Sequence, residues 1–308
     1  MDQFKTKIQQ ISNQLKLPFV LMASLEKDRY RKPCMGMWEH LEKLCGRSLD
    51  RSKSIFVGDA AGRPATSVPK KKKDFSDTDR KLALNIGLNF FTPEEFFLSQ
   101  PPQEYILSGF DAKAYLNDLK QKNQLSKPTI QPASCQELVL MVGLPGSGKT
   151  SAFKRFLKPH DYEWINNDTL KTKETCLKAT ESYLTSKKSV VIDNTNLESA
   201  TRKLYIDLAI KFKAQVRCFV FSMEFRLCKH NALFRSNSLC PSLVNGKPIA
   251  AIPDVVFNTF LRKYQQPDVK EGIDSIESVP FIPLFSSEWS ESELSPEQQE
   301  KEWTLHYF

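Results

Sequence analysis

The sequence has 308 residues, enough for about two domains, and a formal net charge of +8 at pH 7. Its apolar and charged fractions are those of an ordinary globular protein, no apolar run approaches the roughly 20 residues of a membrane span, and residues 1–10 lack a signal-peptide core. Seven scattered cysteines without a C-x-x-C pair argue against a zinc site or a disulfide framework and favour a reducing compartment. The basic surplus favours a polyanionic partner, with a charge that only serves solubility as the alternative.

Helical and extended patterns are mixed in the first hundred residues. Apolar residues at three- and four-residue spacing predict a helix over residues 1–16, ended by Pro18. Apolar runs and stop signals predict the other elements, which are a strand at 19–22, a helix at 35–44, a strand at 55–59, a helix at 76–88, and a turn with a short aromatic helix at 90–97.

The predicted strand at residues 55–59 is buried and delivers the carboxylate of Asp59 at its C-terminal end. Ligands of open α/β sheets lie at the carboxyl ends of strands, so Asp59 is well placed for chemistry. An aspartate that only caps a turn before Gly62 is the alternative. Farther along, four consecutive lysines at residues 70–73 suit a solvated loop, a nuclear address or a contact with a phosphate backbone, and all three remain open.

Residues 99–134 carry four prolines among polar residues, which predicts a partly ordered connection between domains. From residue 135 onward, strand and helix patterns alternate, which predicts an α/β domain with a parallel sheet and helices on both faces. The acidic residues 286–301 predict a mobile tail, whereas residues 303–308 are apolar enough to dock. The expected strands are 138–142, 163–165, 190–192 and 216–221, and the expected helices are 149–157, 169–186, 198–213, 224–235 and 253–264.

A G-x-x-x-x-G-K-T motif lies between the strand at 138–142 and the helix at 149–157. Its glycines let backbone N–H groups turn inward and cradle phosphate oxygens, and the helix N-terminus adds partial positive charge. In such loops the lysine reaches the outer phosphates of a nucleotide and the threonine hydroxyl ligates Mg²⁺. A turn that binds nothing is the alternative. The predicted nucleotide-binding residues are Gly143, Gly146, Ser147, Gly148, Lys149 and Thr150.

Polar residues follow the next two predicted strands. Asp168 suits a general base for a phosphoryl acceptor hydroxyl, and it equally suits the N-cap of the next helix. Asp193 suits a carboxylate that holds Mg²⁺-bound water or the phosphate loop, with a simple turn residue as the alternative. Arg235 would neutralise charge as a phosphoryl group transfers, and Arg202 would contact an anionic substrate. For both arginines, a solvated helix face is the alternative.

These motifs resemble the polynucleotide kinase 3′-phosphatases, a family of bifunctional DNA end-processing enzymes. Residues 143–150 match the family's phosphate loop, residues 193–196 match its D-N-T-N sequence, and residues 230–235 resemble its H-N-N-R-F-R lid with Leu233 in place of an arginine. Residues 166–169 match its N-R-D-T segment, with Asn167 where the family usually has arginine.

The resemblance implies a P-loop kinase domain that uses ATP and Mg²⁺. In that domain Lys149, Asp168 and Arg235 would be catalytic, Asn167 would contact the substrate, and Asp193 would support the metal bound by Thr150.

Residues 1–98 are similar to the family's phosphatase domain, which is of the haloacid-dehalogenase type with a Rossmann-like sheet. Lys32 matches its phosphate-side lysine, and Asp59 matches its metal-binding aspartate. The family's D-x-D-G-T nucleophile motif is absent, and the only D-x-D is residues 77–79, which lie in a different matched segment. The covalent phospho-aspartate route is therefore unavailable. We expect a remnant domain without 3′-phosphatase activity, in a chain that begins partway through the phosphatase domain.

The absent first strand is normally central in such a sheet. We therefore expect exposed edges and apolar faces, and an N-terminal half that is loosely packed or prone to aggregate. The expected domains are a partial phosphatase domain at 1–98, a linker at 99–134, a kinase domain at 135–285 and a tail at 286–308.

The expected function is ATP-dependent phosphorylation of the 5′-hydroxyl ends of DNA in strand-break repair, in the nucleus. The net charge of +8 would guide DNA into the cleft. A small-molecule P-loop kinase and a non-catalytic DNA-end-binding protein are the alternatives, and RNA ends remain open as substrates. Repair scaffold proteins are the partners that the family suggests, although its phosphopeptide-binding domain is absent from this sequence, and no membrane is expected. Oligomeric state, preferred break geometry and the existence of a longer form are not determined by the sequence.

Overall fold

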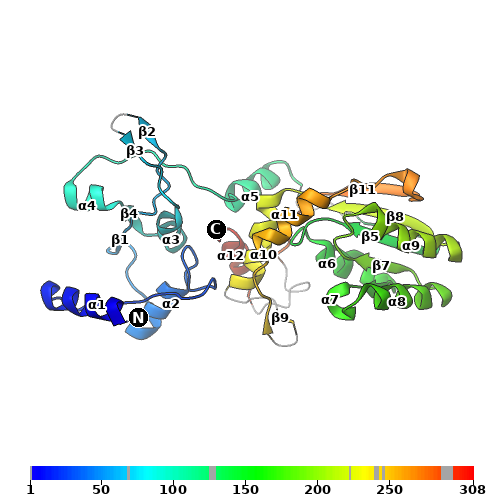
Figure 1. Cartoon of the computed structure of the whole chain (residues 1–308), viewed down its shortest axis with the longest axis horizontal. Coiled ribbons are helices and arrows are strands. Elements are labelled where there is room, and N and C mark those ends of the chain that lie inside the picture. Colours follow the sequence, from blue (N-terminus) through cyan, green and yellow to red (C-terminus); the bar gives the residue numbers. More distant parts are fainter. Residues whose placement is uncertain are drawn as a thin grey trace.

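The computed structural model describes residues 2–67, 70–124, 130–221, 223–238, 243–244, 247–285 and 294–308. The elements of the first hundred residues gather at one end of the molecule, and a five-stranded sheet with its helices forms the other end (Figure 1). No helix in these described ranges is long and apolar enough to cross a membrane.

Short elements make up the N-terminal half. Strand β1 pairs with β4 in parallel, and β2 pairs with β3 in antiparallel orientation. The helices are α1 (Asp2–Leu15), α2 (Gly36–Cys45), α3 (Thr78–Ile86) and α4 (Pro93–Leu98), and the strands are β1 (Ile55–Val57), β2 (Thr66–Ser67), β3 (Lys70–Lys71) and β4 (Asn89–Phe91).

The helices expected at residues 1–16, 35–44 and 76–88 are present as α1, α2 and α3. The strand expected at residues 19–22 is wrong, because these residues adopt no regular secondary structure and most of their apolar side chains are exposed. Strand β4 was not predicted, since it exists only by pairing with β1, which is remote in the sequence.

The N-terminal half has a small core and a large exposed apolar surface. Exposure reaches 67% at Leu17, 85% at Leu25 and 71% at Phe97, so the expected exposure of apolar faces is confirmed. Loose packing and aggregation stay predictions. The core cluster consists of Leu82, Ala83, Ile86 and Leu88, with Met35, Trp38, Phe56 and Phe90 packed against it.

The connection expected at residues 99–134 contains a helix, α5 (Ala112–Gln121), that was not predicted. The side chain of Asp111 caps it by accepting a hydrogen bond from the N–H of Ala114. Helix α5 buries Ala112 and Leu116 in a cluster with residues of the second half, so this part of the connection is docked rather than free.

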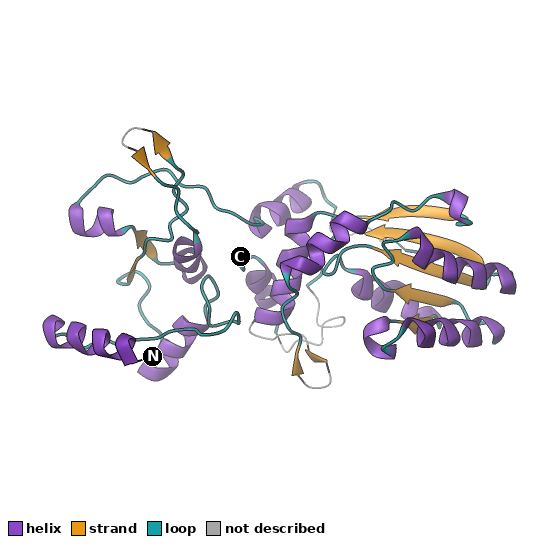
Figure 2. Ribbon diagram, viewed as in Figure 1, coloured by secondary structure: helices purple, strands orange, loops and turns teal. Residues whose placement is uncertain are grey.

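A parallel sheet forms the second half, with the strand order β11-β8-β5-β7-β6 (Figure 2). The strands expected from the sequence are present, whereas the edge strand β11 was not predicted. Its sequence Ser-Ile-Glu-Ser-Val carries only two apolar residues and gives a weak strand signal. The strands are β5 (Glu137–Val142), β6 (Glu163–Ile165), β7 (Val190–Asp193), β8 (Gln215–Phe221) and β11 (Ser275–Val279), and a separate antiparallel pair is formed by β9 (Leu243–Val244) and β10 (Lys247–Pro248).

Both faces of the sheet are covered, as the alternation of strands and helices predicted. Helices α8 and α9 pack on one face, against Leu138 and Leu140 of β5. The segment from α6 into η1 packs on the other face, against Val139 and Met141. The helical segments are α6 (Lys149–Ala152), η1 (Phe153–Leu157), η2 (Lys158–His160), α7 (Asn167–Leu170), α8 (Lys173–Thr185), α9 (Ser199–Phe212), α10 (Phe225–Asn237), α11 (Asp254–Lys263), η3 (Val269–Glu271) and α12 (Pro296–Trp303).

The helix expected at residues 169–186 is two helices in the structure. Lys171 has a positive φ of 73°, which interrupts the backbone between α7 and α8, and the Thr172 side chain caps α8. The break places α7 as a separate turn beside the sheet edge.

The C-terminal segment differs from the predicted mobile tail. Residues 286–293 lie outside the described residues, but residues 296–303 form α12, which begins with a capping box. Trp303 is buried, in agreement with the docking expected for residues 303–308. The segment also reaches the N-terminal half, because Asn85 exchanges hydrogen bonds with the backbone of His306.

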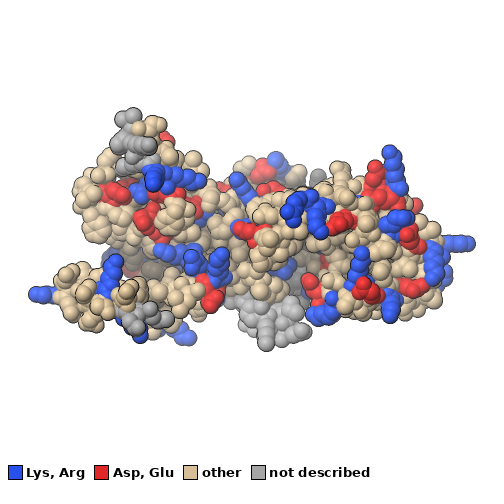
Figure 3. All heavy atoms as spheres, in the orientation of Figure 1, with Lys and Arg blue, Asp and Glu red and all other residues tan. Residues whose placement is uncertain are grey.

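Charge is spread widely over the molecule. On the face drawn in Figure 3, lysine and arginine side chains are interspersed with acidic ones over both ends of the molecule. On the part of that face that the described residues form, basic side chains are not gathered into a single patch.

Candidate active site

A glycine-rich loop joins the carboxyl end of the central strand β5 to α6. Gly146 and Gly148 have φ values of 81° and 97°, in the left-handed region that favours glycine. A Cβ on Gly143 would lie 2.8 Å from the Ser147 Oγ, and one on Gly146 would lie 2.2 Å from the Cys228 carbonyl oxygen. The tight path of this loop therefore requires glycine at these positions.

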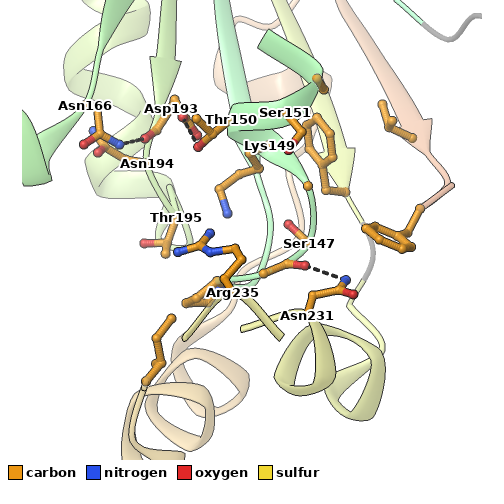
Figure 4. A pocket seen from close by; sticks show the side chains of 18 of the residues that line it. Ser147, Lys149, Thr150, Ser151, Asn166, Asp193, Asn194, Thr195, Asn231 and Arg235 are labelled. Carbon is orange, nitrogen blue, oxygen red and sulfur yellow. Dashed lines mark hydrogen bonds between the residues drawn. The ribbon is translucent and has the colours of Figure 1, made fainter. Parts of the chain in front are cut away.

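A cavity of about 1000 Å³ opens beside this loop. Figure 4 shows side chains of α6, of the loops after β6 and β7, and of α10 around it. It brings together most of the residues that the sequence singled out, which are Gly146, Ser147, Gly148, Lys149, Thr150, Asn167, Asp168, Asp193 and Arg235. Gly143 lies in the same loop but is not part of the cavity wall.

Lys149 is the first residue of α6 and is 9% exposed. Its Nζ donates hydrogen bonds to the carbonyl oxygens of Gly143 (2.9 Å) and Leu144 (2.8 Å). Burial lowers the pKa of Lys149 to about 8, and the nearby carboxylate of Asp193 opposes the shift. Among the described residues, the hydrogen-bond partners of this ammonium group are neutral carbonyls, so its charge is available to an anionic ligand in the cavity.

Asp193 ends β7 and is buried beside α6. One of its carboxylate oxygens accepts hydrogen bonds from the Thr150 hydroxyl (2.6 Å) and the Trp164 indole N–H (3.0 Å). Trp164 was not predicted as a site residue, because its role depends on the pairing of β6 with β7. These two contacts hold the Asp193 carboxylate beside Thr150, next to the glycine-rich loop.

The site residues fit a nucleotide phosphate with Mg²⁺. Buried Ser147 Oγ has no hydrogen-bond partner among the described residues, as expected for a group that awaits a ligand. Hydroxyl and carboxylate oxygens, as in Thr150 and Asp193, are what Mg²⁺ prefers, and Mg²⁺ is usually held by one or two carboxylates together with substrate phosphates.

Asp168 lies on α7 and is exposed to the cavity. The N-cap of α7 is Asn166, whose side-chain oxygen accepts from the N–H groups of Asp168 (2.9 Å) and Thr169 (3.3 Å). The alternative role of Asp168 as a helix cap is therefore filled by another residue. Its neighbour Asn167 also faces the cavity, and the Asn167 backbone N–H donates to the Asn194 side chain (2.8 Å).

Arg235 comes from the last turn of α10, and its guanidinium extends toward Lys149 in Figure 4. Burial lowers the pKa of Arg235, while the carboxylates of Asp193 and Asp168 oppose that shift. Its Nε has no hydrogen-bond partner among the described residues. Because arginine stays protonated, Arg235 adds a fixed positive charge to the cavity.

Arg202 is not a substrate-binding residue, and the prediction made for it is wrong. Its side chain is completely buried and forms a two-pronged ion pair with Glu271 (2.8 and 2.5 Å). Its third nitrogen donates to the carbonyl oxygens of Asn196, Leu197 and Gln265. Arg202 therefore holds together the loop after β7, and the sequence could not reveal this because Glu271 is 69 residues away.

Two further asparagines shape the site. The buried Asn196 side chain donates to the carbonyl oxygens of Met141 (2.8 Å) and Ile192 (3.0 Å), which joins the ends of β5 and β7. The Asn231 side chain donates to the Gly146 carbonyl oxygen (2.9 Å), which joins α10 to the loop. Both lie within motifs recognised in the sequence, but their contacts are long-range and could not be predicted.

The residues matched to a phosphatase lie apart from this cavity. Lys32 forms an ion pair with Asp79 (2.5 Å), and Asp79 also accepts from the N–H of Ala60 (3.1 Å). Ala60 follows Asp59, so Lys32 is brought to the carboxyl end of β1 where Asp59 lies exposed. A metal-binding role for Asp59 stays a prediction.

Comparisons with known proteins fit this division. Residues 1–97 match the family model described as polynucleotide kinase 3 phosphatase, and residues 138–266 match one described as an AAA domain. Over 282 residues the chain is 40% identical to the bifunctional polynucleotide phosphatase/kinase of Schizosaccharomyces pombe, a match that covers 90% of this chain and 64% of that protein.

Two other relatives agree with this pattern. A protein of Acanthamoeba polyphaga mimivirus, whose description also names a bifunctional polynucleotide phosphatase/kinase, is 35% identical over 282 residues, covering 85% of this chain and 65% of that protein. The polynucleotide 3′-phosphatase ZDP of Arabidopsis thaliana is 49% identical over 73 residues, covering 23% of this chain and 9% of that protein. The chain thus spans slightly less than two thirds of the length of the two long matches.

Replacing Arg202 tests its structural role. We expect Arg202→Ala to lower the free energy of unfolding by about 3–5 kcal/mol, because Glu271 would remain as an unpaired, largely buried charge. Chemical denaturation measures this loss. The neighbouring Lys203→Ala removes an exposed pair with Asp207 and should change the value by less than about 0.5 kcal/mol. Unchanged stability of Arg202→Ala, together with a raised KM for a substrate, would restore the substrate-binding role.

Proposed function

Because this chain is related over nine tenths of its length to bifunctional polynucleotide phosphatase/kinases, we propose that it is a polynucleotide 5′-hydroxyl kinase. It transfers the γ-phosphoryl group of ATP to the 5′-hydroxyl end of a nucleic acid. The observation that carries the proposal is one cavity that joins a P-loop lysine, an exposed carboxylate and a lid arginine, namely Lys149, Asp168 and Arg235.

The loop and α6 would bind the triphosphate. Inward N–H groups of the glycine loop and the Lys149 ammonium neutralise phosphate oxygens. Thr150 and Asp193 would hold Mg²⁺, which supplies further charge neutralisation on the phosphates when bound. Arg235 stabilises the negative charge that spreads over the transferring phosphoryl group.

Asp168 is proposed as the general base. It accepts the proton of the 5′-hydroxyl as the hydroxyl oxygen attacks the γ-phosphorus and ADP leaves. Two features support this role. Asp168 is exposed to the cavity, and the N-cap of α7 is Asn166 rather than Asp168. Asn167, beside it, is proposed to contact the nucleic-acid end.

The substrate is proposed to be DNA, in strand-break repair in the nucleus. The relatives' descriptions name polynucleotides, and the net charge of +8 favours a polyanion. The lysine run at residues 70–73 supports a nuclear address. Repair scaffold proteins belong to the same proposal as partners. RNA ends are the alternative substrate, and 5′-hydroxyl DNA and RNA oligonucleotides of one sequence, compared by kcat/KM, distinguish the two.

Kinase activity is tested by transfer of labelled γ-phosphate from ATP to a 5′-hydroxyl oligonucleotide. We expect Lys149→Ala and Asp168→Asn each to lower kcat by about 10²–10⁴-fold, since one removes phosphate stabilisation and the other the base. Glu174→Gln, the same chemical change on the exposed first turn of α8, is the matched control and should keep full activity. Inhibition by sugars or nucleosides but not by DNA would instead indicate a small-molecule kinase. Full activity of the Asp168→Asn variant would exclude Asp168 as the general base.

The pKa of Lys149 predicts how ATP binding depends on pH. Since burial lowers this pKa to about 8, the Lys149 side chain of the free protein is charged well below pH 8 and loses its charge as the pH rises through 8. We expect the Kd for ATP to rise above pH 8 by at most about tenfold per pH unit, because one proton is linked to binding. Lys149→Arg stays charged and should show a flat profile from pH 8 to 9.5. Parallel profiles for both proteins would contradict the assignment.

We also infer that residues 1–308 alone do not release 3′-phosphate. The sequence has no D-x-D-G-T nucleophile, so Lys32 and Asp59 would support a reaction that lacks its attacking group. A 3′-phosphorylated oligonucleotide should remain intact under conditions in which the kinase turns over. Phosphate release that disappears in Asp59→Ala would contradict this inference.

A further inference from the structure

We propose that Trp303, in the C-terminal helix α12, is a positioning residue for the phosphate loop, which rests on the proposed nucleotide binding. Its indole N–H donates to the side-chain oxygen of Asn231 (2.9 Å). The amide nitrogen of Asn231 donates to the Gly146 carbonyl oxygen in the loop (2.9 Å). Two hydrogen bonds therefore connect a helix at the end of the described chain to the turn that would hold phosphate.

The chemistry of the two groups fixes the direction of this relay. An indole nitrogen can only donate, so it must face the oxygen of the Asn231 amide. The amide NH₂ must then face the Gly146 carbonyl, which can only accept. If the Asn231 amide were rotated by half a turn, its NH₂ group would face the indole N–H and its oxygen would face the Gly146 carbonyl oxygen, so both hydrogen bonds would be lost. Because Asn231 and Trp303 are both buried, water does not readily replace either contact.

The hydrogen bond from Asn231 reaches the loop at Gly146, where the loop packs closely against α10. It has the left-handed φ of 81°, and the site of its missing Cβ touches the Cys228 carbonyl oxygen of α10. The loop therefore lies directly on α10, without a side chain between them. The same helix carries Arg235 into the cavity, so the position of α10 sets both the loop and the lid cation.

Trp303 is itself held from several sides. Its ring stacks on Phe281 with a centroid distance of 6.1 Å, and its carbonyl oxygen is hydrogen bonded to His230 Nε2 of α10 (2.7 Å). Phe281 in turn lies against Gly148, where a Cβ would be 3.4 Å from its ring. Trp303 also lines the cavity, so α12 forms part of the wall of the nucleotide site. A residue held so firmly can impose its orientation on Asn231.

A double-mutant cycle tests the relay. The variants are Trp303→Phe, which keeps an aromatic ring but loses the N–H donor, Asn231→Ala, and the two combined. We expect Trp303→Phe to raise the Kd for MgATP about three- to tenfold, the change in equilibrium for one hydrogen bond. Adding it to Asn231→Ala should cause no further loss, because the relay is then already broken. The KM for ATP should rise while the KM for the oligonucleotide stays constant.

Tyr307→Phe is the matched control. It also removes one buried donor from the C-terminal segment, since the Tyr307 hydroxyl donates to the Glu302 carbonyl oxygen (3.1 Å), but this bond does not reach the loop. ATP affinity should stay at the wild-type value in this variant, with both variants checked for folding by thermal unfolding. An equal loss of ATP affinity in Tyr307→Phe and Trp303→Phe would indicate general loosening of α12 and would overturn the proposal.

The remaining outcomes are also decisive. Wild-type ATP affinity in Trp303→Phe, or additive losses in the double variant, would overturn the relay while leaving the kinase proposal intact. If Trp303→Phe does not fold, Asn231→Ala still removes the loop contact with the aromatic cluster in place, and wild-type affinity there overturns the relay. A wild-type protein that binds no ATP would overturn the proposed function and this inference with it.

Discussion

The second half of the molecule depends on one buried positive charge. A cation removed from water is tolerated only where oxygen atoms or counter-charges surround it. The Lys149 ammonium meets this condition because the Gly143 and Leu144 carbonyls accept its hydrogen bonds and the Asp193 carboxylate is close enough to favour the charged form. These groups come from the carboxyl ends of β5 and β7, which are neighbours in the sheet. The strand order is therefore what allows the charge to be buried, and a phosphate could later take over the place of the carbonyl partners.

Two arginines show how context decides the role of a residue type. Arg202 is paired with a largely buried carboxylate and donates to three backbone carbonyls, so its charge stabilises the loop after β7 and is not available to a ligand. Arg235 is also largely buried, yet its carboxylate neighbours, Asp168 and Asp193, act on it only through the electric field of the cavity. Its charge thus remains available to an anion. The difference lies in distant partners, and nothing in the local sequence around either arginine reveals it.

The sequence predicted what is encoded locally and missed what is created by pairing. Apolar runs located β5, β6, β7 and β8, and the glycine motif located the loop, because these signals need no knowledge of other segments. The strands β4 and β11 are visible only through their partners β1 and β8. Helices α5 and α12 have polar sequences with few apolar residues. These apolar residues are buried only because the two helices contribute to one hydrophobic cluster, which the local sequence does not reveal. In the site, residue types were predictable, whereas Trp164 and Trp303 depend on packing between remote elements.

The contact between Trp303 and Asn231 has a consequence for biosynthesis. Domains tend to fold from the N-terminus as the ribosome releases the chain, and the whole parallel sheet precedes α12 in the sequence. A nascent chain can therefore complete its sheet while Asn231 has no indole beside it and one wall of the cavity is missing. The same C-terminal segment carries His306, whose backbone exchanges hydrogen bonds with Asn85 of the N-terminal half. The cavity wall that Trp303 forms is therefore completed only after every strand of the sheet has been synthesised, when α12 docks against α10.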